Sequence, residues 1–208
     1  FTDAFTPIPN SSNGTGPDSQ IYFHGVKLYP ALGYLPYDLA LMKVSKVCEE
    51  KQIPVTSHCG GVRTHPSKDD IKVDYLDSSF KLKSKTIHLK NSRKSGNDFS
   101  KYFIRPEHWE RVLQKYPNLK INIAHLGDNN EWRNYRKGDT NGTVERTFQL
   151  IKNHKHVFAD LSYFFYTKAN VKAIYRELKS DLELQSKIMY GSDFYMCQIE
   201  EGEMNEYY

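Results

Sequence analysis

The chain has 208 residues, a net charge of +4 and three cysteines, and 38% of its residues are hydrophobic. This length suits one domain with its own core, or most of a barrel that ordinarily has roughly 250 residues. The small positive charge argues against a strongly basic nucleic-acid-binding domain, and the three cysteines argue against a disulfide framework. No apolar run is long enough to span a membrane, and we expect a cytoplasmic protein.

The first 20 residues are expected to form a linker or an irregular N-terminal segment. Residues 7–20 are rich in Pro, Gly, Ser and Asn and offer few apolar side chains to a core. We therefore place the folded domain at residues 21–208.

Five short apolar segments, rich in β-branched and aromatic residues, predict the strands of this domain. They are Ile21–Tyr29, Ile53–Cys59, Ile121–Leu126, Val157–Ser162 and Ile188–Asp193. Helical patterns lie between them: Asp38 opens a helix that runs through Glu50, and helical spacing of apolar residues recurs from Trp109 to Tyr116 and from Val171 to Leu178. Alternating strands and helices predict an α/β fold with a parallel sheet.

Ionisable residues lie at or near the ends of four of these strands. They are Lys27, His58, His125 and Asp193. In a parallel barrel the carboxyl ends of the strands meet at one mouth, where active sites are found. A single histidine at a strand end is more often structural, but the recurrence favours a ring of metal-binding or catalytic groups.

Four segments in this order resemble the amidohydrolase-related family of metal-dependent hydrolases and decarboxylases. The segments are Gly-Val-Lys-Leu-Tyr-Pro at 25–30, Ile-Pro-Val-Thr-Ser-His-Cys-Gly-Gly at 53–61, Pro-Asn-Leu-Lys-Ile-Asn-Ile-Ala-His-Leu-Gly at 117–127 and Tyr-Gly-Ser-Asp-Phe at 190–194. The resemblance implies a (β/α)8 TIM barrel. It also implies that the protein activates water on a divalent metal to attack a small carbonyl, amide or carboxylate-bearing substrate, with decarboxylation as a variant.

The resemblance assigns roles to the polar strand ends. His58 and His125 are similar to the metal-binding histidines that end the fifth and sixth strands of the family, and Asp193 to the aspartate that ends the eighth. The implied metal is zinc, as one ion or two, and Asp193 is the expected general base. Lys27 is either a carboxylated lysine that bridges two metals or an ordinary hydrogen-bond donor. Tyr29 and Arg63 are expected to contact the substrate.

One departure from the family concerns its first strand, which ends in His-x-His. No such pair precedes Ile21, and His154-Lys155-His156 follows a predicted helix, on the face opposite the expected site. We therefore expect the chain to hold roughly the last five βα units of the barrel.

A long polar insertion, residues 60–104, follows the His58 strand and is expected to form a lid over the site. Its basic and aromatic residues raise two alternatives to an enzyme. The chain could be a non-catalytic barrel remnant, or a protein that binds nucleic acid or another anionic ligand. A solvated, mobile loop is the simpler interpretation of the insertion. We expect a small-molecule substrate, with neither nucleic acid nor a membrane as a partner, and leave a homo-oligomer open.

Overall fold

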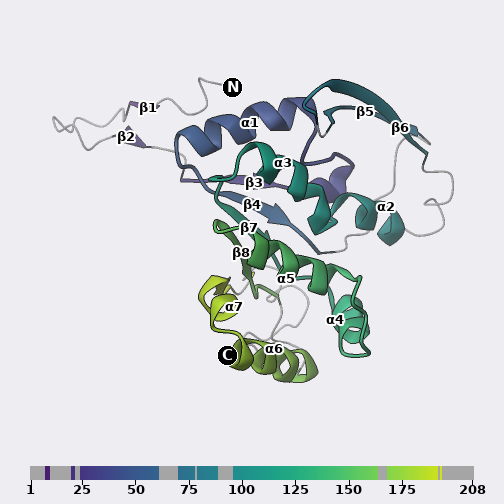
Figure 1. The fold of residues 1–208 in the computed structure, drawn as a ribbon, viewed down its shortest axis with the longest axis vertical. Helices are drawn as coiled ribbons and strands as arrows, with labels where there is room; N and C mark the ends of the chain where they lie inside the picture. The colour runs from purple at the N-terminus through teal and green to yellow at the C-terminus, as the bar shows by residue number, and fades with distance from the viewer. Residues whose placement is uncertain are drawn as a thin grey trace.

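The computed structural model describes residues 8–9, 20–21, 24–60, 70–77, 79–88, 96–163, 168–191 and 193. At its centre is a five-stranded parallel sheet whose strands follow one another in chain order (Figure 1). They are β3 (Val26–Leu28), β4 (Val55–His58), β7 (Ile121–Ala124), β8 (Val157–Asp160) and β9 (Ile188–Met189). Because the order never reverses, every crossover moves in one direction, as in a barrel and unlike a doubly wound sheet. The predicted α/β fold with a parallel sheet is confirmed.

Helices connect successive strands as the sequence patterns indicate. They are η2 (Pro30–Leu32), α1 (Leu39–Glu50), η4 (Pro106–Trp109), α3 (Glu110–Lys115), α4 (Asn129–Tyr135), α5 (Thr143–Asn153), α6 (Lys168–Ser180) and α7 (Leu182–Lys187). Asp38 is the N-cap of α1, where its side chain accepts a hydrogen bond from the backbone N–H of Ala40. None of the described helices is long and apolar enough to cross a membrane.

The two faces of the sheet differ in character. Leu28, Ser57 and Ile123 are aligned on neighbouring strands and are buried in the core. Side chains alternate along a strand, so residues one position away project from the opposite face. That face carries the polar side chains Lys27, His58, Asn122 and Asp160. The fold therefore separates an apolar helix-packing face from a polar one.

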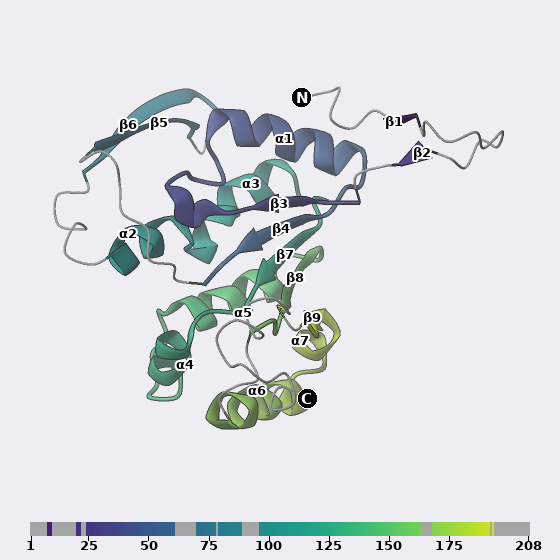
Figure 2. The same ribbon diagram turned by 180° about the vertical axis from the view of Figure 1, so that it is seen from behind.

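The insertion between β4 and η4 is more ordered than a polar loop. It contains the antiparallel hairpin β5 (Asp70–Leu76) and β6 (Leu82–His88), followed by α2 (Gly96–Phe103). Val73, Ile87 and Phe103 are buried in the core, so the insertion contributes to the packed interior. The hairpin lies beside α1, whereas α6 and α7 lie at the other end of the molecule (Figure 2).

The first and last predicted strands are shorter than expected. Ile21 belongs to β2 (Gln20–Ile21), which pairs antiparallel with β1 (Ile8–Pro9), and the central sheet begins only at Val26. This places a short β ladder within the segment expected to be a linker. At the other end, β9 contains two residues, although it pairs with β8 as predicted.

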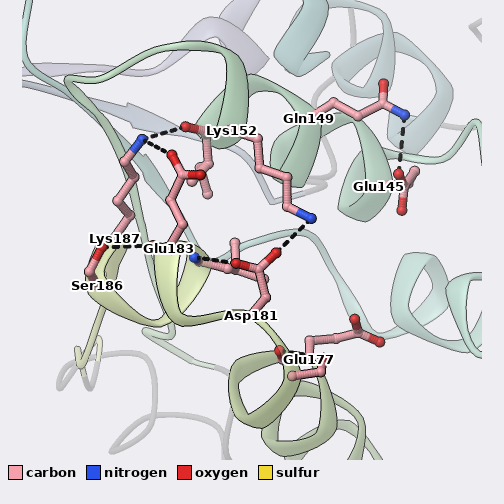
Figure 3. A network of polar contacts seen from close by, with 11 residues as sticks. Glu145, Gln149, Lys152, Glu177, Asp181, Glu183, Ser186 and Lys187 are labelled. Atoms are coloured by element: carbon pink, nitrogen blue, oxygen red, sulfur yellow. Dashed lines mark hydrogen bonds and ion pairs between the residues drawn. The ribbon is translucent and has the colours of Figure 1, made fainter.

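A buried lysine fixes the helix that precedes β9. Lys187, shown in Figure 3 beside Glu183, donates from Nζ to the carbonyl oxygens of Ile151, at 2.7 Å, and His154, at 3.2 Å. Ile151 lies in the last turn of α5, where carbonyls lack a helical donor, and His154 is the C-cap residue of that helix. Glu183 accepts a third hydrogen bond from the same ammonium at 3.1 Å. The end of α7 is thereby held against the end of α5.

Candidate active site

Two histidines meet at the carboxyl ends of β4 and β7. His125 Nε2 lies 3.0 Å from His58 Nδ1. The two rings are 4.6 Å apart between centroids and nearly perpendicular, with an interplanar angle of 72°. The two ring nitrogens are therefore within hydrogen-bond distance of each other.

His58 lies in a closely packed environment that favours its neutral form. The ring of Tyr29 stacks on it at 4.0 Å between centroids with an interplanar angle of 17°. The pKa of His58 is lowered to about 3, mainly by burial and to a smaller extent by the nearby His125 and Lys27. Its Nε2 atom is buried and has no hydrogen-bond partner within the described residues. A neutral imidazole is the form that binds a metal.

The backbone at the end of β7 adopts an uncommon conformation. His125, Leu126 and Gly127 have φ angles of 71°, 46° and 89°, so three consecutive residues lie in the left-handed region. This region costs non-glycine residues free energy and persists where the surrounding structure holds it. The buried Trp132 helps to hold it by donating from Nε1 to the carbonyl oxygen of Leu126 at 2.9 Å. The turn directs the His125 ring towards His58.

Asp160, at the end of β8, is the site residue that the sequence reasoning missed. Its Oδ1 accepts hydrogen bonds from the backbone N–H of His125, at 3.1 Å, and of Ser162, at 3.0 Å. The Ser162 hydroxyl also donates to Oδ1, and Asn122 Nδ2 donates to Oδ2 at 2.6 Å. Burial alone raises the pKa of Asp160, but these hydrogen bonds hold the pKa below its ordinary value. Asp160 is therefore an anion that anchors the turn at His125.

A signal for Asp160 was present in the sequence. Val157–Ser162 is predicted as an apolar strand, yet Asp160 ends the observed strand as His58 ends β4. Comparison of strand-end positions alone would have included it.

Lys27 and Asp193 interact through their charges. Desolvation lowers the pKa of Lys27, while the negative charges of Asp160 and Asp193 act in the opposite direction. Asp193 also helps to raise the pKa of Tyr29, although burial is the larger cause. Its φ of 50° makes Asp193 another left-handed residue at the site. The Asp193 carboxylate thus affects the pKa values of both Lys27 and Tyr29.

The two histidines fit a metal such as zinc. Zn–N bonds of about 2.0–2.1 Å place two nitrogen ligands roughly 2.9–3.4 Å apart for bond angles of about 90–110°. The 3.0 Å separation of His58 Nδ1 and His125 Nε2 falls within this range. Within the described ranges, no group of three or more His, Cys, Asp or Glu side chains has a geometry that could hold a metal ion. Asp193 as a third ligand thus stays a prediction, and Arg63 lies outside the described residues.

Comparisons with known proteins agree with this architecture. The model of a family described as Amidohydrolase matches residues 19–203. Among solved structures, an uncharacterized TIM-barrel protein from Bordetella bronchiseptica matches with a TM-score of 0.50 at 16% sequence identity, a level that supports the fold alone. The match covers 84% of this chain and 47% of that protein, so the chain spans about half the length of this neighbour. No curated protein matches the chain.

Proposed function

The chain belongs to the amidohydrolase family, and from this premise we propose that the full-length protein is a metal-dependent hydrolase. Its proposed substrate is a small molecule with a carbonyl or amide group, or one that carries a carboxylate. Decarboxylation is a variant of the same chemistry on this fold. Fold alone does not select among these reactions, so the proposal depends on the site.

The observation that carries the proposal is the convergence of two imidazole nitrogens from different strands. His58 Nδ1 and His125 Nε2 lie 3.0 Å apart, as ligands of one zinc ion would. Burial keeps His58 neutral, with a pKa of about 3. His125 is held by a left-handed turn, and such backbone strain is concentrated at functional sites.

In the proposed site, His58 and His125 would hold the metal, with Asp193 as the third ligand and the general base. A divalent metal bound there would lower the pKa of a water molecule and polarise the substrate carbonyl. Asp193 would serve there as the general base. Tyr29 covers one face of His58 and limits the access of solvent to that ring.

Lys27 has two proposed roles, both at the polar face of β3. As an ammonium, it attracts a substrate carboxylate and discourages a cation from binding beside it. As a carboxylated lysine, it would provide a carboxylate that holds metal ions. Desolvation that lowers the pKa of Lys27 favours the neutral amine, which is the form that reacts with carbon dioxide. Mass spectrometry of the intact protein under non-acidic conditions distinguishes the two roles by the added mass.

Metal content tests the proposal. Full-length protein purified without chelator should contain a zinc-like divalent cation by elemental analysis, and His58→Ala and His125→Ala should each lose most of it. His88→Ala is the matched control, because His88 is an exposed histidine of the β5–β6 hairpin. A metal-free wild-type protein that turns over substrate would contradict the proposal.

A further inference from the structure

We propose that Asp160 and Ser162 are positioning residues that fix the ring orientation and the tautomer of His125. They hold the Nδ1–H of His125 on one side, which leaves the lone pair of Nε2 directed at His58. The effect of this arrangement on metal binding rests on the proposed function. The arrangement itself is a property of the metal-free protein.

The tautomer follows from the two groups that contact Nδ1 of His125. The carbonyl oxygen of Ser162 lies 3.1 Å from this nitrogen, and the hydroxyl oxygen of Ser162 lies 2.9 Å from it. A carbonyl oxygen can only accept a hydrogen bond, so Nδ1 must carry the hydrogen. A neutral imidazole has one N–H, and Nε2 is therefore the acceptor in the contact with His58 Nδ1 at 3.0 Å.

Asp160 determines how the Ser162 hydroxyl is oriented. This hydroxyl donates its single hydrogen to Asp160 Oδ1, so its lone pairs remain available to the Nδ1–H of His125. The same Oδ1 accepts the backbone N–H of His125 at 3.1 Å. One carboxylate oxygen thus holds the backbone at the left-handed residue and, through Ser162, the imidazole ring.

Asn122 completes the arrangement by fixing the plane of the carboxylate. Its Nδ2 donates to Asp160 Oδ2 at 2.6 Å. Both carboxylate oxygens therefore accept hydrogen bonds. An asparagine at position 160 has only one oxygen, so its NH2 group would face a donor, either that of Asn122 or those of His125 and Ser162. Asp160→Asn must lose part of the arrangement whichever way the amide is turned.

A ligand histidine held in this way has its metal-binding nitrogen oriented in advance. Partners that bind the other ring nitrogen of a metal-binding histidine typically change metal affinity by about 10–100-fold when they are removed. We expect losses in this range for Asp160→Asn. Ser162→Ala should give a smaller loss, because the backbone carbonyl of residue 162 still accepts the Nδ1–H.

The test compares Asp160→Asn, Ser162→Ala and the double variant Asp160→Asn with Asn122→Asp. In the double variant the amide at 160 can donate to the new carboxylate at 122 and accept with its oxygen, so the arrangement should be restored. Asp181→Asn is the control, because Asp181 also accepts a backbone N–H, that of Leu184 at 2.9 Å, but belongs to the α7 cap.

Two readouts are measured. The first is the 15N chemical shifts of the His125 ring in metal-free protein, which report the tautomer; wild type and control should show Nδ1–H, and Asp160→Asn should shift towards Nε2–H. The second is the dissociation constant for zinc, which should rise in the two single variants and recover in the double variant.

The proposal is overturned if Asp160→Asn and Ser162→Ala both keep the wild-type tautomer and bind zinc within twofold of wild type. It is also overturned if Asp181→Asn changes both readouts as much as Asp160→Asn does. If Asp160→Asn does not fold, Ser162→Ala decides by its dissociation constant for zinc, because the carbonyl of residue 162 keeps the Nδ1–H tautomer in that variant. A wild-type protein that binds no zinc would contradict the proposed function, while the 15N shifts would still decide the positioning role.

Discussion

His125 Nε2 lies 3.0 Å from His58 Nδ1, although the two histidines are 67 residues apart in the chain. Parallel pairing of β4 with β7 accounts for this proximity, because it aligns His58 with Ala124, the residue before His125. The left-handed turn at His125 then carries its ring back towards β4. The strand pairing thus brings the two histidines close together, and the turn orients the His125 ring towards His58.

The buried state of His58 predicts how stability depends on pH in metal-free protein. Its folded pKa of about 3 lies below the ordinary value of 6.5, so between these pH values the unfolded chain binds the additional proton. The free energy of unfolding should therefore fall as the pH falls from 6.5 towards 3, with a slope from this residue of at most about 1.4 kcal/mol per pH unit. Urea titrations with chelator at several pH values measure this.

The variant that isolates this effect is His58→Gln, which cannot take up the proton. Its unfolding free energy should depend less steeply on pH than that of wild type over the same range. His88→Gln is the control, since His88 is exposed. Equal slopes for wild type and His58→Gln would show that His58 is not the source.

Much of the fold could be predicted because it depends on local patterns. The β-branched core of Ile121–Ala124 and the Asp38 N-cap of α1 are visible in the sequence and are observed in the structure. Strand ends were less predictable. Ile21 is as apolar as Val26, but it pairs with Ile8 instead of joining the sheet, and this choice depends on a tertiary contact.

The site was predictable in its strand-end residues and not in their supports. His58 and His125 could be identified from their positions. The role of Asp160 depends on its hydrogen bonds to the turn at His125, and the residue types in that turn do not predict its left-handed conformation. Leu126 is an improbable residue for a φ of 46°, so sequence preference argues against the turn that the structure contains. Here the tertiary hydrogen bonds of Asp160 and Trp132 outweigh the local preference.

Two lysines near α7 should differ in their importance to stability (Figure 3). Lys187 is buried and donates to two backbone carbonyls and to Glu183. Lys187→Met should cost about 1–3 kcal/mol because the Ile151 carbonyl loses this donor, whereas the His154 carbonyl keeps the N–H of Val157. Lys152 forms an ion pair with Asp181 at 2.7 Å and is half exposed, so Lys152→Met should cost less than about 1 kcal/mol. Chemical denaturation of both variants measures the difference, and equal losses would contradict the assigned role of Lys187.

We expect that the insertion does not bind nucleic acid, because of the charges in its described part. In residues 70–77 and 79–88, four lysines are accompanied by the carboxylates of Asp70, Asp74 and Asp77. Lys85 is directed inward and donates to the Tyr37 hydroxyl at 2.9 Å. The affinity of a nucleic-acid site should fall steeply as the salt concentration rises, because binding to phosphates releases counterions. Filter binding at low salt should detect no complex, and a complex that dissociates on addition of salt would revive the alternative function.

Asp193→Asn in the full-length protein should abolish turnover while the fold is preserved. The structure strengthens the second half of this expectation, because Asp193 has a φ of 50° and asparagine adopts the left-handed region at least as readily as aspartate. The backbone at the end of β9 should therefore be retained. Gly191, two residues earlier, packs closely on Ser162, and this contact does not involve the side chain at 193.

The loss of activity has two sources in the proposed site. An amide cannot accept the proton that a metal-activated water releases, and removal of such a base typically slows a reaction by about 10²–10⁴-fold. An amide is also a weaker metal ligand than a carboxylate, so metal content should fall. If Asp193 instead has only a structural role, the substitution should lower the melting temperature and leave the rate of the folded protein nearly unchanged. Steady-state kinetics, elemental analysis and a thermal melt of the same preparation separate these outcomes, and near-normal turnover would remove Asp193 from the mechanism.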